Sequence, residues 1–206
     1  MQKNQIQKFT ESGVLLALAT VLSFIPLFNL PQGGTVTVCS LMPLAILAYR
    51  YGFKWGILCS FLYSLIQLVI GIKNISYCKT WVAVVVVILF DYFIPYTIFG
   101  ITGMFKNKIK NQNLSISLGM IICTFIRFIC HIFSGYTVWG EWAEGEWLEA
   151  LCRVLNVSSP KLTVLIYSVV YNSYVLVDIA VSVVAVCALG LIINYREQGF
   201  VRVKRK

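Results

Sequence analysis

Six long apolar stretches fill most of this chain and restrict it to one class of fold. Hydrophobic residues make up 59% of the sequence and charged residues 12%, with a mean hydropathy of +0.81, outside the range of soluble globular domains. A helix needs about 20 largely apolar residues to cross a bilayer. The candidate stretches are residues 9–28, 38–52, 54–72, 81–105, 114–137 and 162–194. We therefore predict an all-α integral membrane protein with six transmembrane helices.

Charge gives this predicted bundle a direction. Six helices and their connections use all 206 residues, so we expect one membrane domain over 1–206, with external loops near 28–37, 73–80 and 138–161. One side of the membrane then receives most of the basic residues, which are Lys3, Lys8, Arg50, Lys54, Lys106, Lys108, Lys110 and the tail 196–206. The positive-inside rule places that side, and both termini, in the cytoplasm of a prokaryotic cell. The net charge of +9 is explained by this orientation and does not call for nucleic acid.

Motifs for catalysis and for metal binding are missing from the sequence. It has no G-x-x-x-x-G-K-[ST], H-E-x-x-H or G-x-S-x-G motif, and it contains a single histidine. None of the seven cysteines forms a C-x-x-C pair, and most lie within apolar stretches. We expect no enzyme activity, no metal site and no cofactor.

Polar residues within three of the apolar stretches converge on one depth. With the predicted orientation, Asp91, His131, Tyr167 and Asn172 lie in the outer halves of their helices, and Trp139 lies at the outer end of 114–137. Charged or polar residues inside a membrane usually face a partner, a cavity or a ligand. A carboxylate, aromatic rings and an amide together suit a small cationic heteroaromatic ring. We predict a pocket that opens to the outside.

Structural explanations of the same residues stay open. Asp91 and Arg127 could form an ion pair that only supports the helices, and His131 could satisfy a structural hydrogen bond. A second membrane carboxylate, Asp178, ends a helical stripe with Tyr167, Tyr171 and Tyr174, and such stripes usually serve packing. Tyr167 and Asn172 are about 140° apart on an ideal helix, so a shared pocket needs a wide wall or an irregular turn.

Prolines, glycines and small residues suggest local irregularities and close contacts. Pro95 cannot donate to the carbonyl of Asp91, which favours a kink there. Pro31, Gly33 and Gly34 suit a tight turn that could approach a ligand or simply connect two helices. The segment 146–156 could form a short amphipathic helix at the outer surface. A small-x-x-x-small pair, Gly13 and Ala17, permits close helix contact, either within the protein or with a partner.

Several separated motifs follow one another along the chain. These motifs are T-E-S-G-V-L-L-A (10–17), P-Q-G-G-T-V-T (31–37) with M-P (42–43), Y-R-Y-G-F-K-W-G (49–56), F-D-Y (90–92), G-I-T-G-M-F (100–105), R-F-I-C-H-I-F-S-G-Y-T-V-W (127–139) and I-Y-S-V-V-Y-N (166–172). In this order they resemble one protein family, the thiamine-specific substrate-binding subunits (S components) of energy-coupling factor transporters. The similarity extends over essentially all six apolar stretches.

The resemblance implies a high-affinity thiamine-binding subunit that contacts the vitamin through Asp91, Tyr92, His131, Trp139, Tyr167 and Asn172. It also implies that Gly13 and Ala17 dock a membrane coupling subunit, which joins two cytoplasmic ATPases. Some family members carry glutamate in place of Asp91, and some carry tryptophan where Gly34 stands at the pocket. The alternatives are a subunit for a pyrimidine or thiazole precursor, and a membrane enzyme or assembly protein whose buried charges are structural.

Overall fold

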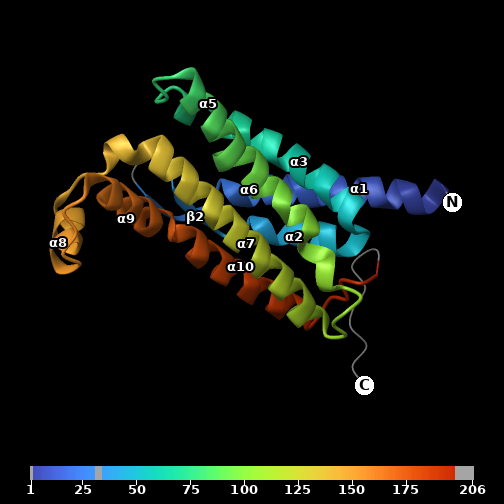
Figure 1. Cartoon of the computed structure of the whole chain (residues 1–206). Coiled ribbons are helices and arrows are strands. Elements are labelled where there is room, and N and C mark those ends of the chain that lie inside the picture. The colour runs from blue at the N-terminus through green and yellow to red at the C-terminus, as the bar shows by residue number, and fades with distance from the viewer. Residues whose placement is uncertain (1, 31–33, 198–206) are drawn as a thin grey trace.

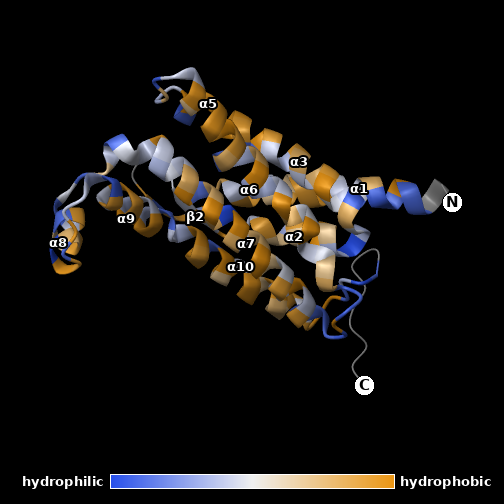
Figure 2. Ribbon diagram, viewed as in Figure 1, coloured by the Kyte–Doolittle hydropathy of each residue, from blue (hydrophilic) through white to orange (hydrophobic). Residues whose placement is uncertain are grey.

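Long helices packed side by side form an elongated bundle in the computed structural model, which describes residues 2–30 and 34–197. The start of α1 (Gln2–Ser23) and the end of α10 (Tyr174–Gly190) lie at one end of the bundle, and α8 (Glu146–Val154) lies at the other (Figure 1). Hydrophilic residues gather at these two ends, while apolar residues cover the lengths between them (Figure 2). A bilayer favours this arrangement because helices satisfy their own backbone polar groups.

Within residues 2–30 and 34–197, four helical stretches are long and apolar enough to cross a membrane. These are α3 (Phe53–Ile70), Trp81–Phe105, α7 (Gln112–Thr137) and Pro160–Gly190. They correspond to four of the six predicted stretches. The other two contain α1 and the 11-residue α2 (Leu41–Tyr51), which at 1.5 Å per residue is about 16 Å long and shorter than the hydrocarbon core. The structure therefore supports a mostly helical protein that crosses the membrane several times.

The expectation of an all-helical chain is wrong at one place, because two short strands follow α1. Strand β1 (Pro26–Asn29) pairs antiparallel with β2 (Thr35–Thr37), and an irregularity in register follows Pro26. Proline has no amide hydrogen and disfavours a helical residue before it, so the predicted helix 9–28 ends at Ser23. The β-branched run in β2 favours a strand. The predicted turn at Pro31 and Gly33 lies outside the described residues, as does the basic tail beyond residue 197.

The stretch 81–105 departs from regular α-helical hydrogen bonding. It consists of α5 (Trp81–Val87), the π-helical turn η2 (Ile88–Phe93), α6 (Ile94–Thr97) and the 3₁₀ helix η3 (Ile98–Phe105). The irregularity that Pro95 predicts is present, and it takes the form of a π turn that contains Asp91. Single π turns within helices often occur at functional sites.

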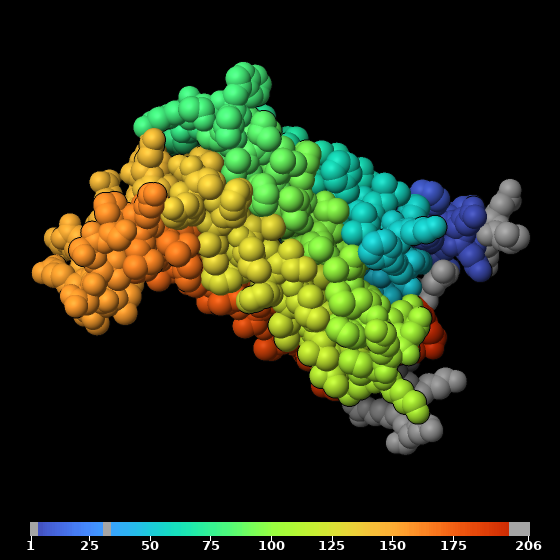
Figure 3. Space-filling view, in the orientation of Figure 1, coloured from blue at the N-terminus to red at the C-terminus, as the bar shows by residue number. Residues whose placement is uncertain are grey.

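The connections at the α8 end of the bundle are short helices. α4 (Ile72–Ile75) follows α3, and the 3₁₀ turn η4 (Trp139–Trp142) follows α7. The predicted amphipathic helix is confirmed as α8, which buries Leu148 and Cys152 and forms one end of the molecule in the space-filling view (Figure 3). Next, α9 (Pro160–Asn172) and α10 are separated by a break at Ser173.

Helix α7 is central to the packing, since it contacts η2, α6, η3, α9 and α10. At the end of the bundle opposite α8, Glu11 of α1 forms a buried ion pair with Arg50 of α2 and accepts a hydrogen bond from the Tyr51 hydroxyl. The Trp55 indole also donates to the Ser12 hydroxyl at 2.8 Å. These contacts attach α1 to α2 and α3.

Candidate ligand-binding site

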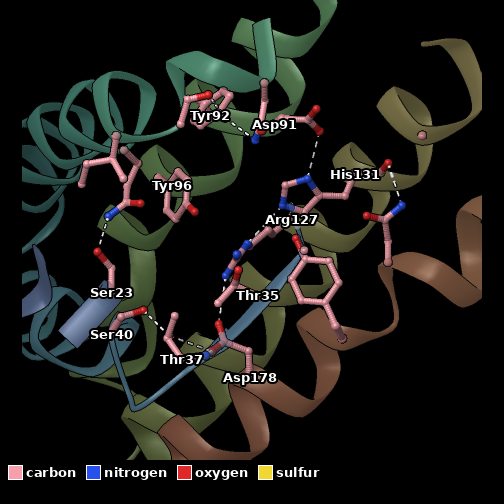
Figure 4. Close-up of a pocket in the computed structure, with 18 of the residues that line it drawn as sticks. Ser23, Thr35, Thr37, Ser40, Asp91, Tyr92, Tyr96, Arg127, His131 and Asp178 are labelled. Atoms are coloured by element: carbon pink, nitrogen blue, oxygen red, sulfur yellow. Dashed lines mark hydrogen bonds and ion pairs between the residues drawn. The ribbon is translucent and has the colours of Figure 1, made fainter. Parts of the chain in front are cut away.

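A polar cavity of about 230 Å³ lies between the β hairpin and the helices (Figure 4). Its walls come from α3, η2, α7, α9 and α10, with β2 along one side. All seven residues predicted for the pocket line this cavity; they are Gly34, Asp91, Tyr92, His131, Trp139, Tyr167 and Asn172. The predicted convergence of separate helices on one site is therefore present in the fold.

The Asp91 carboxylate collects three hydrogen-bond donors. The Trp139 indole nitrogen donates to Oδ2 at 3.1 Å, and the Ser134 hydroxyl donates to the same oxygen at 2.8 Å. The His131 Nδ1 contacts Oδ1 at 3.0 Å. Donors to a carboxylate stabilise its charged form and fix its direction. Ser134 did not feature among the predicted residues, although it follows His131 by three positions on the same helix face.

Arg127 pairs with Asp178 and not with Asp91, so the ion pair considered from the sequence is wrong. Its Nη1 lies 3.3 Å from Asp178 Oδ2. Its Nε donates to His131 Nε2 at 3.3 Å. Because an arginine has only donors, Nε2 of His131 must be the acceptor, and Nδ1 carries the proton that faces Asp91. The imidazole is therefore neutral and stands between the guanidinium and the carboxylate.

Tyr92 is fixed by the C-terminal end of α3 and by α4. Its hydroxyl donates to the carbonyl of Gly71 at 2.9 Å and accepts from the Asn74 amide at 3.1 Å. A Cβ at Gly71 would overlap the Tyr92 ring, so glycine permits this contact. Gly71 and Asn74 line the cavity and were not predicted.

Asn172 is held by α7 and by its own helix. Its amide nitrogen donates to the carbonyl of His131 at 3.2 Å and to the carbonyl of Ser168 at 2.8 Å. Tyr167 also reaches the cavity, so the wall is wide enough for both side chains despite their angular separation.

The tyrosine stripe forms a cavity wall as well as a packing surface. Tyr167 stacks on Trp147 with ring centroids 5.9 Å apart and on Tyr171 at 5.5 Å. Tyr171, Tyr174 and Asp178 all line the same cavity. The interpretation of this stripe as packing alone is therefore incomplete.

The hairpin closes against this wall at Gly34. The Gly34 amide donates to the Tyr171 hydroxyl at 3.2 Å. A Cβ at this position would lie 3.1 Å from Tyr174 and 3.2 Å from the Tyr171 oxygen, so a side chain there would require these neighbours to shift. Glycine thus allows the hairpin to approach the tyrosines closely, and the suggested approach to a ligand stays a prediction.

A second, more open cavity of about 520 Å³ lies on the other side of the tyrosine wall. It is lined mainly by apolar and aromatic side chains from the hairpin, η4 and α8–α10, including Phe28, Trp142 and Trp147. Tyr167, Tyr171 and Tyr174 border both cavities.

The charges of the first cavity favour a monocation. Asp91 and Asp178 each supply one negative charge, Arg127 supplies one positive charge, and His131 is neutral, which leaves a net charge of −1. Aromatic faces beside this charge attract cations. Among residues 2–30 and 34–197, no cluster of histidine, cysteine and acidic side chains could hold a metal ion.

The predicted docking pair on α1 faces away from the rest of the protein. Gly13 and Ala17 are exposed, and a Cβ built on Gly13 meets no atom within 4 Å. Packing within the protein therefore does not account for this pair.

Comparisons with known proteins find thiamine transporters. Residues 9–197 match the model of a family described as "Thiamine transporter protein (Thia_YuaJ)". The chain is 25% identical to the thiamine transporter ThiT of Bacillus subtilis over 201 residues, which cover 91% of this chain and 92% of the relative. It is 24% identical to ThiT of Lacticaseibacillus paracasei over 153 residues, covering 69% and 73%. A solved structure of ThiT from Listeria monocytogenes has the same fold, with a TM-score of 0.65, 22% identity and coverage of 91% and 94%.

Proposed function

The chain belongs to the thiamine transporter protein family, and from this premise we propose that its cavity binds thiamine with high affinity for uptake across the cell membrane. The family consists of transport proteins and not enzymes, and thiamine is a transported ligand in it and not a cofactor. With its long apolar helices, the chain is a multi-pass membrane protein. The observation that carries the proposal is the Asp91 carboxylate, oriented by three donors at an aromatic cavity of net charge −1.

Thiamine offers the complementary groups. Its thiazolium ring carries one positive charge, which Asp91 would balance, and the ring faces of Trp139 and Tyr167 would stack on flat heterocycles. The aminopyrimidine ring has donors and acceptors that the Asn172 side chain can match. Tyr92 and Gly34 would complete the walls around the ligand.

We propose that six segments cross the membrane, with α1 and the short α2 as the first two, and that both termini are cytoplasmic. Three observations support this orientation. The basic residues Arg50 and Lys106 are in contact with each other, in segments that lie at the end of the bundle away from α8 (Figure 1). The acidic connection that contains Glu141 and Glu144 lies at the α8 end. The cavity lies toward that acidic end and would open outside the cell, as an uptake protein requires.

Transport would use partner subunits, since the sequence has no motif for ATP hydrolysis. We propose that the exposed face of α1 around Gly13 and Ala17 docks a membrane coupling subunit, which joins two cytoplasmic ATPases. Small residues allow two helices to approach closely within a bilayer. A Gly13→Leu variant should keep thiamine binding by the isolated protein and lose co-purification with the coupling subunit.

The direct test is a titration of the purified protein with thiamine, followed by quenching of tryptophan fluorescence. We expect saturable quenching at nanomolar to low micromolar thiamine. A neutral pyrimidine or thiazole precursor, added in competition, should displace thiamine only at much higher concentration, because it lacks the positive charge. Tighter binding of a precursor than of thiamine would reassign the substrate, and absence of binding to either would refute the proposal.

A further inference from the structure

Two carboxylates and one guanidinium share the interior of the site, and the guanidinium is committed to one of them. Arg127 Nη1 lies 3.3 Å from Asp178 Oδ2, and both side chains are almost inaccessible, at 5% and 2% exposed. The Asp91 side chain is 18% exposed and faces the cavity. The buried pair is therefore internally neutral, and the carboxylate that a ligand can reach keeps its charge.

The β hairpin holds Asp178 in place. Asp178 Oδ1 accepts hydrogen bonds from the amide and the hydroxyl of Thr37, each at 3.0 Å. The Thr37 hydroxyl also contacts the Ser40 hydroxyl at 2.6 Å. One oxygen of the carboxylate thus accepts hydrogen bonds from the hairpin, while the other faces Arg127 (Figure 4).

His131 keeps Arg127 one imidazole ring away from Asp91. Its Nε2 accepts from Arg127 at 3.3 Å, and its Nδ1 donates to Asp91 at 3.0 Å. The guanidinium also lies over the Tyr96 ring, 5.1 Å from the centroid. These contacts and Asp178 together hold the positive charge behind the histidine.

We propose that Asp178 is a positioning residue that determines charge specificity: by neutralising Arg127, it leaves the charge of Asp91 available to a cationic ligand. Without the charge of Asp178, the positive charge of Arg127 would offset the negative charge of Asp91 on the other side of His131. The net charge of the cavity would then change from −1 to zero. The site would then lose its preference for a cation over a neutral molecule of the same shape. This inference rests on the proposed function, since it explains how that site recognises the thiazolium charge.

The test compares two ligands of equal shape in the purified full-length protein. One is thiamine, and the other is its uncharged analogue in which a thiophene ring replaces the thiazolium. In Asp178→Asn, thiamine should bind about tenfold to a hundredfold more weakly, while the Kd of the neutral analogue should change by less than about threefold. Asparagine can still accept from Thr37, so the hairpin contact is retained.

A double variant separates a role of Asp178 in charge specificity from a merely structural role. Arg127→Gln with Asp178→Asn removes both charges, restores a net charge of −1 and should return the ratio of the two Kd values to within about threefold of the native ratio. Thr37→Val is the matched control: it removes a hydrogen bond to Asp178 without changing charge, and any effect should be equal for the two ligands.

The outcomes separate this inference from the proposed function. Failure of the native protein to bind thiamine would refute the proposed function. Native binding combined with an equal loss of both ligands in Asp178→Asn, or with no recovery of the ratio in the double variant, would refute the role of Asp178. If Asp178→Asn alone does not fold, the double variant decides, because a charge-neutral replacement of the pair must retain the native cation preference.

Discussion

Replacing Asp91 with asparagine should weaken thiamine binding and also lower stability, for two separable reasons. The native carboxylate accepts from Ser134 and Trp139 on one oxygen and from His131 on the other. An asparagine has one acceptor oxygen, so if that oxygen keeps two of the donors, its amide group faces the Nδ1 hydrogen of His131. Changing the tautomer only moves the conflict, because Nε2–H would then face the donor of Arg127.

The magnitudes follow from these contacts. One lost hydrogen bond at a buried site costs about 1–3 kcal/mol, and this cost applies to the free protein as well as to the complex. It should therefore appear in the free energy of unfolding. The attraction between Asp91 and a ligand cation exists only in the complex. At about 4 Å and an effective dielectric constant of about 20 it is about 4 kcal/mol, an upper limit, so we expect Kd to rise about a hundredfold.

Isothermal titration calorimetry and thermal unfolding in detergent measure the two effects on the same sample. Asp91→Glu is the control, since it keeps the charge and the acceptor oxygens and lengthens the side chain by one methylene. Its Kd should remain within about tenfold of the native value. If Asp91→Asn binds thiamine within about threefold of the native protein, the carboxylate does not recognise the cation and the reasoning fails.

Three further variants test other parts of the structure. Trp139→Phe leaves a smaller ring to stack on the ligand and removes one of the three donors that orient the Asp91 carboxylate toward it, so Kd measured by calorimetry should rise about fivefold, and an unchanged Kd would show that neither contribution matters for binding. Gly135→Ala places a methyl group against the hydroxyl and amide side chains packed on it and should weaken binding about tenfold, whereas Gly13→Ala, where the added methyl meets no atom, should bind normally. Glu11→Gln leaves the buried Arg50 guanidinium without its anion and should lower the stability by about 3 kcal/mol in thermal unfolding with no change in Kd, while a loss of affinity would link α1 to the cavity.

The sequence predicts the long helices well, because bilayer burial demands extended apolar runs that any hydropathy argument detects. It also predicts that Asp91, His131 and Trp139 meet, since helix direction alone places them at one depth. The π turn at Asp91 could be anticipated only as an irregularity. Pro95 shows that one backbone donor is missing, but it does not show which hydrogen bonds form in its place.

The partner of Arg127 could not be predicted, because Asp91 and Asp178 lie at suitable positions on different helices. The choice depends on the rotation of each helix about its axis, which depends on tertiary packing. Ser134 and Gly135 escaped notice for another reason. Small residues are common in membrane helices, so their presence carries little signal until a neighbour is seen.

The cavity walls come from segments spread along the chain, from Ser23 to Asp178, with the hairpin closing one side. A ligand bound there would touch helices that otherwise meet across an opening, and its binding energy would become part of the stability of the whole bundle. A ligand at a hundred times its Kd raises the free energy of unfolding by about 2.7 kcal/mol. The bound vitamin would then stabilise the folded bundle by linking its helices, and the empty protein would be the form most exposed to denaturation and proteolysis.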